Sequence, residues 1–140
     1  MQKTQTQGFT LIEILIVVVI LSILAIAVVP QFLDQPEKAR IARAKSDIQS
    51  LKTALDMYKL DNFSYPSTSQ GLQALVSKPA GQPEARNWKP NGYMEKMVKD
   101  PWGNDYQYLN PGNHGAVDIY SFGKDGQPGG EGDNADIGNW

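Results

Sequence analysis

Residues 8–29 of the chain read GFTLIEILIVVVILSILAIAVV, an apolar run with a single acid, Glu13, near its start. Only Thr10, Glu13 and Ser22 interrupt the run, so it lacks the polar face of a soluble helix. A helix over residues 9–29 would be about 30 Å long, which matches the apolar thickness of a bilayer. The run therefore predicts a helix that enters a membrane. Its acid requires an explanation, because a charge in hydrocarbon is costly.

Two interpretations of this run are open. It is either a retained anchor or a secretory signal peptide, with Lys3 in the basic region and cleavage after Ala27 in an Ala-Ile-Ala site. The length of the run and its acid favour a retained anchor. The flanking charges do not define the orientation, since the bias toward basic residues after the run weakly favours the wrong orientation for a periplasmic protein. Those basic residues are Lys38, Arg40, Arg43 and Lys45.

The composition of the 140-residue chain allows one compact domain. A net charge of −2, with scattered Lys and Arg, gives no phosphate-binding surface and argues against nucleic acid as a partner. The absence of cysteine excludes disulfides and thiol catalysis, and His114 is the only histidine for a zinc site or for acid–base chemistry. Catalysis therefore has few residues to build on, and we expect that the chain is not an enzyme.

An amphipathic helix is predicted beyond the apolar run. Pro30 and Pro36 predict a kink or a short melted stretch over residues 29–35, because each removes a backbone donor. After them, apolar residues recur at spacings of three and four, which predicts a helix with one buried face. The residues of this stripe are Ile41, Ala44, Ile48, Leu51, Leu55 and Tyr58.

The middle of the chain predicts mixed structure. Ser67 and Gln70 fit a capping box, which predicts a short helix that continues to residue 76. A loop rich in Pro, Asn and Gly follows over 78–92, and residues 100–123 alternate turn chemistry with strand formers around Asn-Pro-Gly at 110–112. The expected class is α+β.

The C-terminal stretch, GKDGQPGGEGDNADIGNW over residues 123–140, is rich in glycine and acids. Its acids are Asp125, Glu131, Asp133 and Asp136. Oxygen ligands on a flexible loop suit Ca²⁺, which accepts six to eight oxygens in irregular geometry, although the spacing does not fit an EF-hand. By composition, a disordered acidic tail is an equally good interpretation.

Residues 3–15, KTQTQGFTLIEIL, resemble the class III signal of type IV pilins and pseudopilins. The resemblance implies that a prepilin peptidase cleaves after Gly8 and methylates the new N-terminal residue, Phe9. It implies a leader over 1–8, a transmembrane and assembly helix over 9–29 and a periplasmic globular domain over 30–140.

The resemblance also gives Glu13 a role in assembly. The new α-amino group on Phe9 is a positive charge in lipid or in a helix bundle, where it is tolerable only when paired. In a filament of staggered subunits, Glu13 would pair with the amine of a neighbour and so define the register. The alternative is an acid that merely lies at the membrane interface.

A wider resemblance covers most of the chain. The segments ALDMYKLDNFSYPSTSQGLQALV over 54–76 and DPWGNDYQY over 100–108, with the acidic loop, resemble the major pseudopilins of type II secretion, the general secretion pathway protein G family. This implies a pilin-like α+β fold, in which a long N-terminal helix packs on a small antiparallel sheet beside a calcium-binding loop. The implied ligands are the carboxylates of Asp125, Asp133 and Asp136 and the backbone carbonyls of Phe122 and Gln127.

The function implied by this resemblance is that of the major subunit of a periplasmic filament that drives folded proteins across the outer membrane. The implied partners are further copies of the chain, minor pseudopilins, an inner-membrane assembly platform, the prepilin peptidase and the membrane. Two alternatives remain. One is a type IV pilin for adhesion or motility, which the missing disulfide disfavours, and the other is a soluble periplasmic calcium-binding module released after Ala27. Many relatives carry an acid where this chain has Lys52, so this chain departs from the pattern that would form an ion pair between subunits at that position.

Overall fold

The computed structural model of the protein describes residues 8–140, and within 27–34 it describes the backbone without the side chains. The chain divides into two compact units, of which the first ends at Glu37 and the second is Lys38–Trp140. The predicted boundaries of the leader, the anchor and the globular domain stay predictions.

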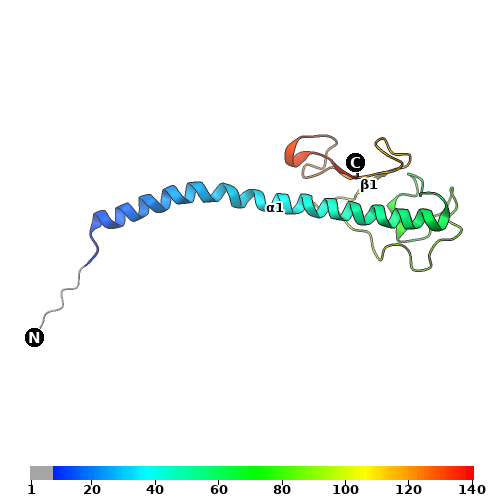
Figure 1. The fold of residues 1–140 in the computed structure, drawn as a ribbon, viewed down its shortest axis with the longest axis horizontal. Coiled ribbons are helices and arrows are strands. Elements are labelled where there is room, and N and C mark those ends of the chain that lie inside the picture. The colour runs from blue at the N-terminus through cyan, green and yellow to red at the C-terminus, as the bar shows by residue number, and fades with distance from the viewer. Residues whose placement is uncertain (1–7) are drawn as a thin grey trace, which may run out of the picture. The chain divides into compact units, whose positions relative to one another are not determined.

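One helix, α1, runs from Leu11 to Asn62 over 52 residues (Figure 1). It continues through Pro30 and Pro36, so the melted stretch that was one of the two alternatives predicted over 29–35 is wrong, and the kink stays a prediction. A proline removes one donor from the helical ladder, and the hydrogen bonds of the turns on either side keep the backbone helical.

The large apolar side chains of residues 9–26 are exposed, from 48% for Val17 to 86% for Leu11. They surround the helix on all sides, as the sequence of the run predicts, and nothing within the first unit covers them. Within the part of the chain whose side chains are described, no helix combines the length and the apolar character needed to cross a membrane.

The core of the second unit forms on the predicted stripe of α1. Five of its six residues are buried, with Leu51 and Leu55 fully inaccessible, and Ile41 packs partly buried against the others. The larger core residues outside α1 are Leu72, Leu75, Tyr106, Tyr108, Val117, Ile119 and Ile137. The hydroxyl of Tyr106 donates to Asp47 of α1 at 2.9 Å, which ties the sheet side of the core to the helix.

Three short strands form one antiparallel sheet in the order β1-β2-β3: β1 is Gln107–Leu109, β2 is Asp118–Ser121 and β3 is Ile137–Gly138. Tyr108 pairs with Ile119, and Ser121 pairs with Ile137. The α+β prediction and the hairpin around residues 110–112 are confirmed. The sequence analysis did not predict β3, because two residues give no periodicity.

The predicted capping box exists but closes a turn. The amide of Ser67 donates to Gln70 Oε1 at 2.9 Å, and the amide of Gln70 donates to Ser67 Oγ at 3.2 Å. The 3₁₀ helix η1 begins only at Leu72 and ends at Leu75, and a second 3₁₀ turn, η2, spans Gly132–Asn134.

Candidate functional site

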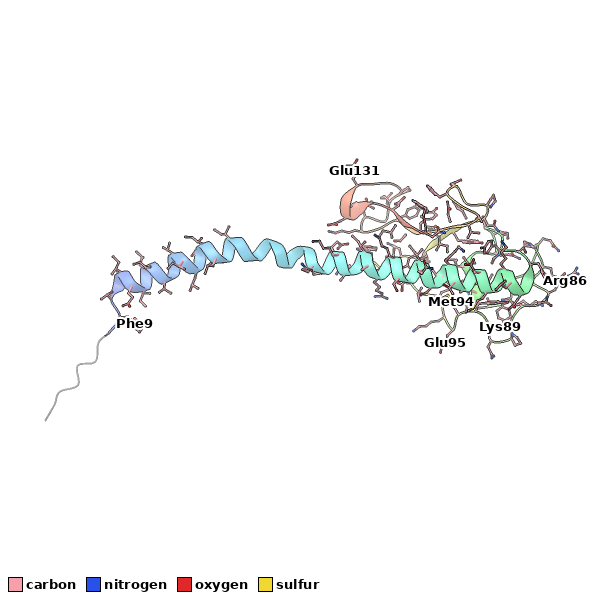
Figure 2. The ribbon with its side chains drawn as sticks, in the orientation of Figure 1. Phe9, Arg86, Lys89, Met94, Glu95 and Glu131 are labelled. Atoms are coloured by element: carbon pink, nitrogen blue, oxygen red, sulfur yellow. The ribbon has the colours of Figure 1, made fainter. Side chains whose placement is uncertain are left out.

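The residues predicted for processing lie at the start of α1. Phe9 is 81% exposed, and Figure 2 shows it just before the helix. A Cβ added at Gly8 would meet nothing within 4 Å, and the backbone there does not adopt the left-handed conformation that favours glycine. The fold of this chain therefore does not require a glycine at this position, and an enzyme that approaches the backbone would benefit from one.

Glu13 caps the helix that carries it. Its amide donates to Thr10 Oγ1 at 3.3 Å, and its carboxylate accepts the amide of Thr10 at 3.4 Å. These reciprocal bonds satisfy donors that the first turn of a helix leaves unpaired, and the carboxylate also faces the positive end of the helix dipole. The sequence analysis missed this role, although Thr-x-x-Glu before an apolar run is the signature of a capping box.

The predicted calcium ligands lie in the loop between β2 and β3. Pairing of Ser121 with Ile137 closes the base of this loop. Phe122, the residue after Ser121, and Asp136, the residue before Ile137, therefore lie side by side where the loop leaves the sheet. Gly123 has φ +71°, and a Cβ there would lie 2.8 Å from the carbonyl oxygen of Ala135. The two arms of the loop therefore approach each other more closely at Gly123 than a larger residue would allow.

The carboxylates of this loop differ in their surroundings. Asp125 and Asp133 are exposed, and Asp125 Oδ1 accepts the amide of Gln127 at 3.0 Å. Asp136 is half-buried, and its Oδ2 accepts the amide of Gly129 at 3.0 Å. Its other oxygen, Oδ1, is buried without a hydrogen-bond partner, which is costly for an acceptor unless a cation or water binds there.

The predicted ligands do not all converge. Among the described residues, no three His, Cys, Asp or Glu side chains lie close enough together to hold a metal ion. The structure thus brings Phe122 and Asp136 to the base of the loop and leaves Asp125 and Asp133 on its exposed part. The donors are all oxygens, and the unpartnered oxygen of Asp136 fits a hard cation such as Ca²⁺.

A buried serine links the start of the loop to the motif at 100–108. Ser121 Oγ donates to Asp100 Oδ2 at 2.6 Å and accepts the amide of Gly123 at 3.0 Å. The other oxygen of Asp100 accepts the amides of Trp102 and Asn104 at 3.0 and 2.8 Å. Asp100 therefore holds its own turn and, through Ser121, the first residues of the acidic loop.

The sequence analysis also missed a cluster that holds the last residues. Asp118 is 1% exposed. Its carboxylate accepts hydrogen bonds from the ring nitrogen Nδ1 of His114 at 3.0 Å and from the amide of Asn113 at 2.8 Å. Burial alone would raise the pKa of Asp118, but these hydrogen bonds outweigh it and hold that pKa below its usual value. The His114 ring stacks on Trp140 at 3.8 Å, which fixes Trp140 beside the loop between β1 and β2. Only folding brings these residues together.

Lys52 has partners within its own chain. Its ammonium donates to Asp56, and the hydroxyl of Tyr65 donates to the same carboxylate oxygen at 2.7 Å. Burial alone would raise the pKa of Asp56, but these two bonds and the charge of Lys52 lower it below its usual value. The charge of Lys52 is thus compensated locally on the surface of α1.

Two family models match adjoining parts of the chain. The model described as type II secretion system, protein G, matches residues 31–140. The prokaryotic N-terminal methylation motif matches residues 3–29. Together they cover the chain from Lys3 to Trp140 except for Pro30.

Similar proteins match over most or all of the chain. The type II secretion system core protein G of Pseudomonas aeruginosa is 59% identical over 140 residues, which cover 100% of this chain and 99% of that protein. The core protein G of Vibrio cholerae is 58% identical over 141 residues, which cover 100% of this chain and 96% of the other. The crystal structure of the major pseudopilin from the type 2 secretion system of enterohaemorrhagic Escherichia coli matches with a TM-score of 0.71 and 51% identity, over 81% of this chain and 96% of that one.

Proposed function

The chain belongs to the type II secretion system protein G family and is a pseudopilus subunit, and from this premise we propose how it is processed, anchored and assembled. A prepilin peptidase removes residues 1–8 and methylates Phe9. Residues 9–29 then hold the subunit in the inner membrane with residues 30–140 in the periplasm. Polymerisation of such subunits, with minor pseudopilins and an assembly platform, drives folded proteins across the outer membrane.

One observation carries this proposal: the helix that begins in the methylation motif exposes its large apolar side chains over residues 9–26, where side chains are described. The exposed apolar side chains of 9–26 need an apolar environment, since an uncovered stripe of this length is unfavourable in water. A bilayer meets that need before assembly, and the packed helices of neighbouring subunits meet it afterwards.

Glu13 is proposed to pair with the α-amino group of Phe9 on a neighbouring subunit. The carboxylate lies about one helical turn from Phe9 within its own chain, and it is exposed, so a neighbour can reach it. A new amine in the apolar interior of a filament requires a counter-charge. Only one axial stagger would pair both charges, which makes this contact a means of register.

Calcium is proposed to bind the loop between β2 and β3. The unpartnered oxygen of Asp136 and the absence of nitrogen or sulfur donors support this choice of ion. The ligands would be the carboxylates of Asp125, Asp133 and Asp136 with the carbonyls of Phe122 and Gln127. The bound ion would neutralise the repulsion among these acids and would order the loop.

The test of the proposed function is complementation. The gene is expressed in a Pseudomonas aeruginosa strain that lacks its own protein G, and export of an enzyme that depends on type II secretion is measured in the medium. Restored export, with filaments seen by electron microscopy when the protein is overproduced, is expected. A stable, processed protein that restores neither export nor filaments would contradict the proposal.

A further inference from the structure

Three of the four large apolar side chains that are exposed within the described residues 35–140 lie at the end of α1. Among the described residues 35–140, the large apolar side chains that are exposed are Met57 at 49%, Leu60 at 78%, Phe63 at 83% and Trp140 at 55%. Met57 and Leu60 are three residues apart and so share a face of α1, and Phe63 follows directly after its last residue. This group of Met57, Leu60 and Phe63 is called the distal patch below.

The backbone of Phe63 is unusual. Its φ is +66°, and it is the one residue other than glycine with a positive φ among those described. Its amide donates to the carbonyl of Lys59 at 2.7 Å, so it occupies the position after a helix where glycine is preferred. A bulky residue that is strained in this conformation and yet solvent-exposed contributes little to its own fold, which points to a contact outside the chain.

The distal patch borders an open hollow with a positive rim. The hollow has a volume of about 570 Å³ and is lined by Asp56, Lys59, Leu60, Phe63 and Tyr65. Asp56 is compensated by Lys52, whereas Lys59 lies over the ring of Tyr65 at 4.7 Å. The hollow therefore suits a partner segment that combines an apolar or aromatic side chain with a negative charge.

The C-terminal segment of the chain has that chemistry. Residues 124–140 carry four acids and one lysine, together with Trp140, whose ring stacks on His114 and is still half exposed. Glu131 lies at the outer tip of this segment, as Figure 2 shows, and it is not among the proposed calcium ligands. Its charge therefore remains when the loop binds calcium.

The two surfaces lie at opposite ends of the helix in the second unit. Trp140 lines a hollow with Ile41 and Lys45, whereas the distal patch begins at Met57 and surrounds Leu60. About 19 residues of helix separate Ile41 from Leu60, or roughly 28 Å along the axis. Complementary surfaces that are displaced along an axis join copies head to tail, and such contacts propagate as an open filament.

We propose that the hollow beside the distal patch receives the C-terminal segment, residues 124–140, of a second copy of this chain, with Lys59 facing Glu131. The proposal rests on the proposed polymerisation and adds a contact between globular units to the packing of the apolar helices. In the monomer both surfaces face solvent. Burial in the contact between copies explains why Leu60 and Phe63 are apolar although the fold of one copy does not bury them.

Phe63→Gly separates this contact from folding. Glycine adopts a positive φ without strain, so the melting temperature of the variant is expected to be equal to or higher than that of the unaltered protein. Filament yield from the full-length protein is expected to fall about fivefold or more, because the variant removes an aromatic side chain from the contact. A variant that assembles at the normal level would overturn the proposal.

Charge exchange tests the facing pair. Lys59→Glu and Glu131→Lys should each lower filament yield, and the double variant should recover most of it. Lys78→Glu, at an exposed lysine outside both surfaces, serves as the control and should assemble normally. A double variant no better than the worse single variant would exclude the pairing of Lys59 with Glu131.

The decisive measurement is a photo-crosslink. Benzoylphenylalanine replaces Phe63 in the full-length chain, filaments are irradiated, and the crosslinked peptides are identified by mass spectrometry. Peptides from residues 124–140 of a second copy are expected, and the same probe at Lys78 should not give them. Filaments with crosslinks to another part of the chain, or to another protein, overturn the contact alone. Failure of the unaltered protein to form filaments overturns the polymerisation and this contact with it.

Discussion

Glu13 caps the helix of its own chain and, in our proposal, also pairs with the α-amino group of Phe9 in a neighbouring chain. In the described structure it completes a capping box with Thr10, and the bonds of 3.3 and 3.4 Å are long enough to be modest contributors. After processing, Phe9 would carry an amine that no residue of the apolar run except Glu13 can neutralise. The two roles can be separated because only one of them requires a negative charge.

Glu13→Gln is therefore more informative than Glu13→Ala. Glutamine retains the capping bonds but not the charge, whereas alanine loses both. Both variants should be processed normally and should fail to assemble, since an unpaired buried amine costs about 3 to 5 kcal/mol. Filament counts and export are the measurements. Normal filaments from Glu13→Gln would show that the residue is needed only for capping.

Gly8→Val should block processing. A Cβ branch does not disturb this chain, because the space around Gly8 is open, but it would obstruct a peptidase that must contact the backbone. The precursor is expected to keep residues 1–8, which a gel and the intact mass distinguish from the mature form. Cleavage of the variant at the normal rate would show that the peptidase does not need glycine before the scissile bond.

At the scale of elements, α1 buries one face in the second unit and leaves the opposite face exposed. Leu55 is fully buried, and Leu60 is 78% exposed five residues later. Leu55→Ala should destabilise the second unit by about 2 to 5 kcal/mol, because it leaves a cavity among core residues. Leu60→Ala, the matched control, should change the free energy of unfolding by less than about 0.5 kcal/mol. Urea denaturation of a fragment of residues 31–140 measures both.

The hairpin between β1 and β2 should make stability depend on pH through Asp118. The folded pKa of this carboxylate lies below its value of 3.8 in an unfolded chain, so its contribution is present above about pH 4 and is lost as pH falls through the folded pKa. Asp118→Asn should cost about 1 to 3 kcal/mol at pH 6 and less at pH 3, which lies below the unfolded pKa of 3.8. The exposed Asp105→Asn is the control. Equal losses at both pH values would mean that the charge of Asp118 does not matter.

At the scale of the whole molecule, calcium bound to the loop between β2 and β3 should stabilise the folded chain. An ion that binds only the folded state stabilises it by about 2.7 kcal/mol at a hundredfold excess over Kd. A fragment of residues 31–140 should therefore melt at a higher temperature with calcium than with a chelator, and magnesium should substitute poorly because it prefers a tighter octahedral shell.

Asp125→Ala should remove most of this response to calcium, whereas Glu131→Ala, which removes an acid of the same loop outside the proposed ligands, should keep it. The shift in melting temperature between calcium and chelator measures both. If the unaltered fragment melts identically in the two conditions, the loop is an acidic segment that binds no calcium.

The sequence by itself determined the fold class, the buried face of α1 and the hairpin, because these depend on local periodicity and turn chemistry. The stripe from Ile41 to Tyr58 repeats at helical spacing, and strand formers flank a turn at 110–112. The family also followed from local motifs, since processing signals are read by enzymes as short linear segments. The melted stretch that proline suggested over residues 29–35 is wrong, because the helix on both sides keeps the backbone helical.

Only the tertiary structure decided β3, the cluster of His114, Asp118 and Trp140, and the exposure of the distal patch. The two residues of β3 have no periodicity of their own. They form a strand because their backbone pairs with the edge of β2. His114 and Trp140 are far apart along the chain, so their stacking depends on the closed sheet. Leu60 and Phe63 are apolar like the core residues beside them, and which apolar residues face solvent depends on what packs against each side of α1.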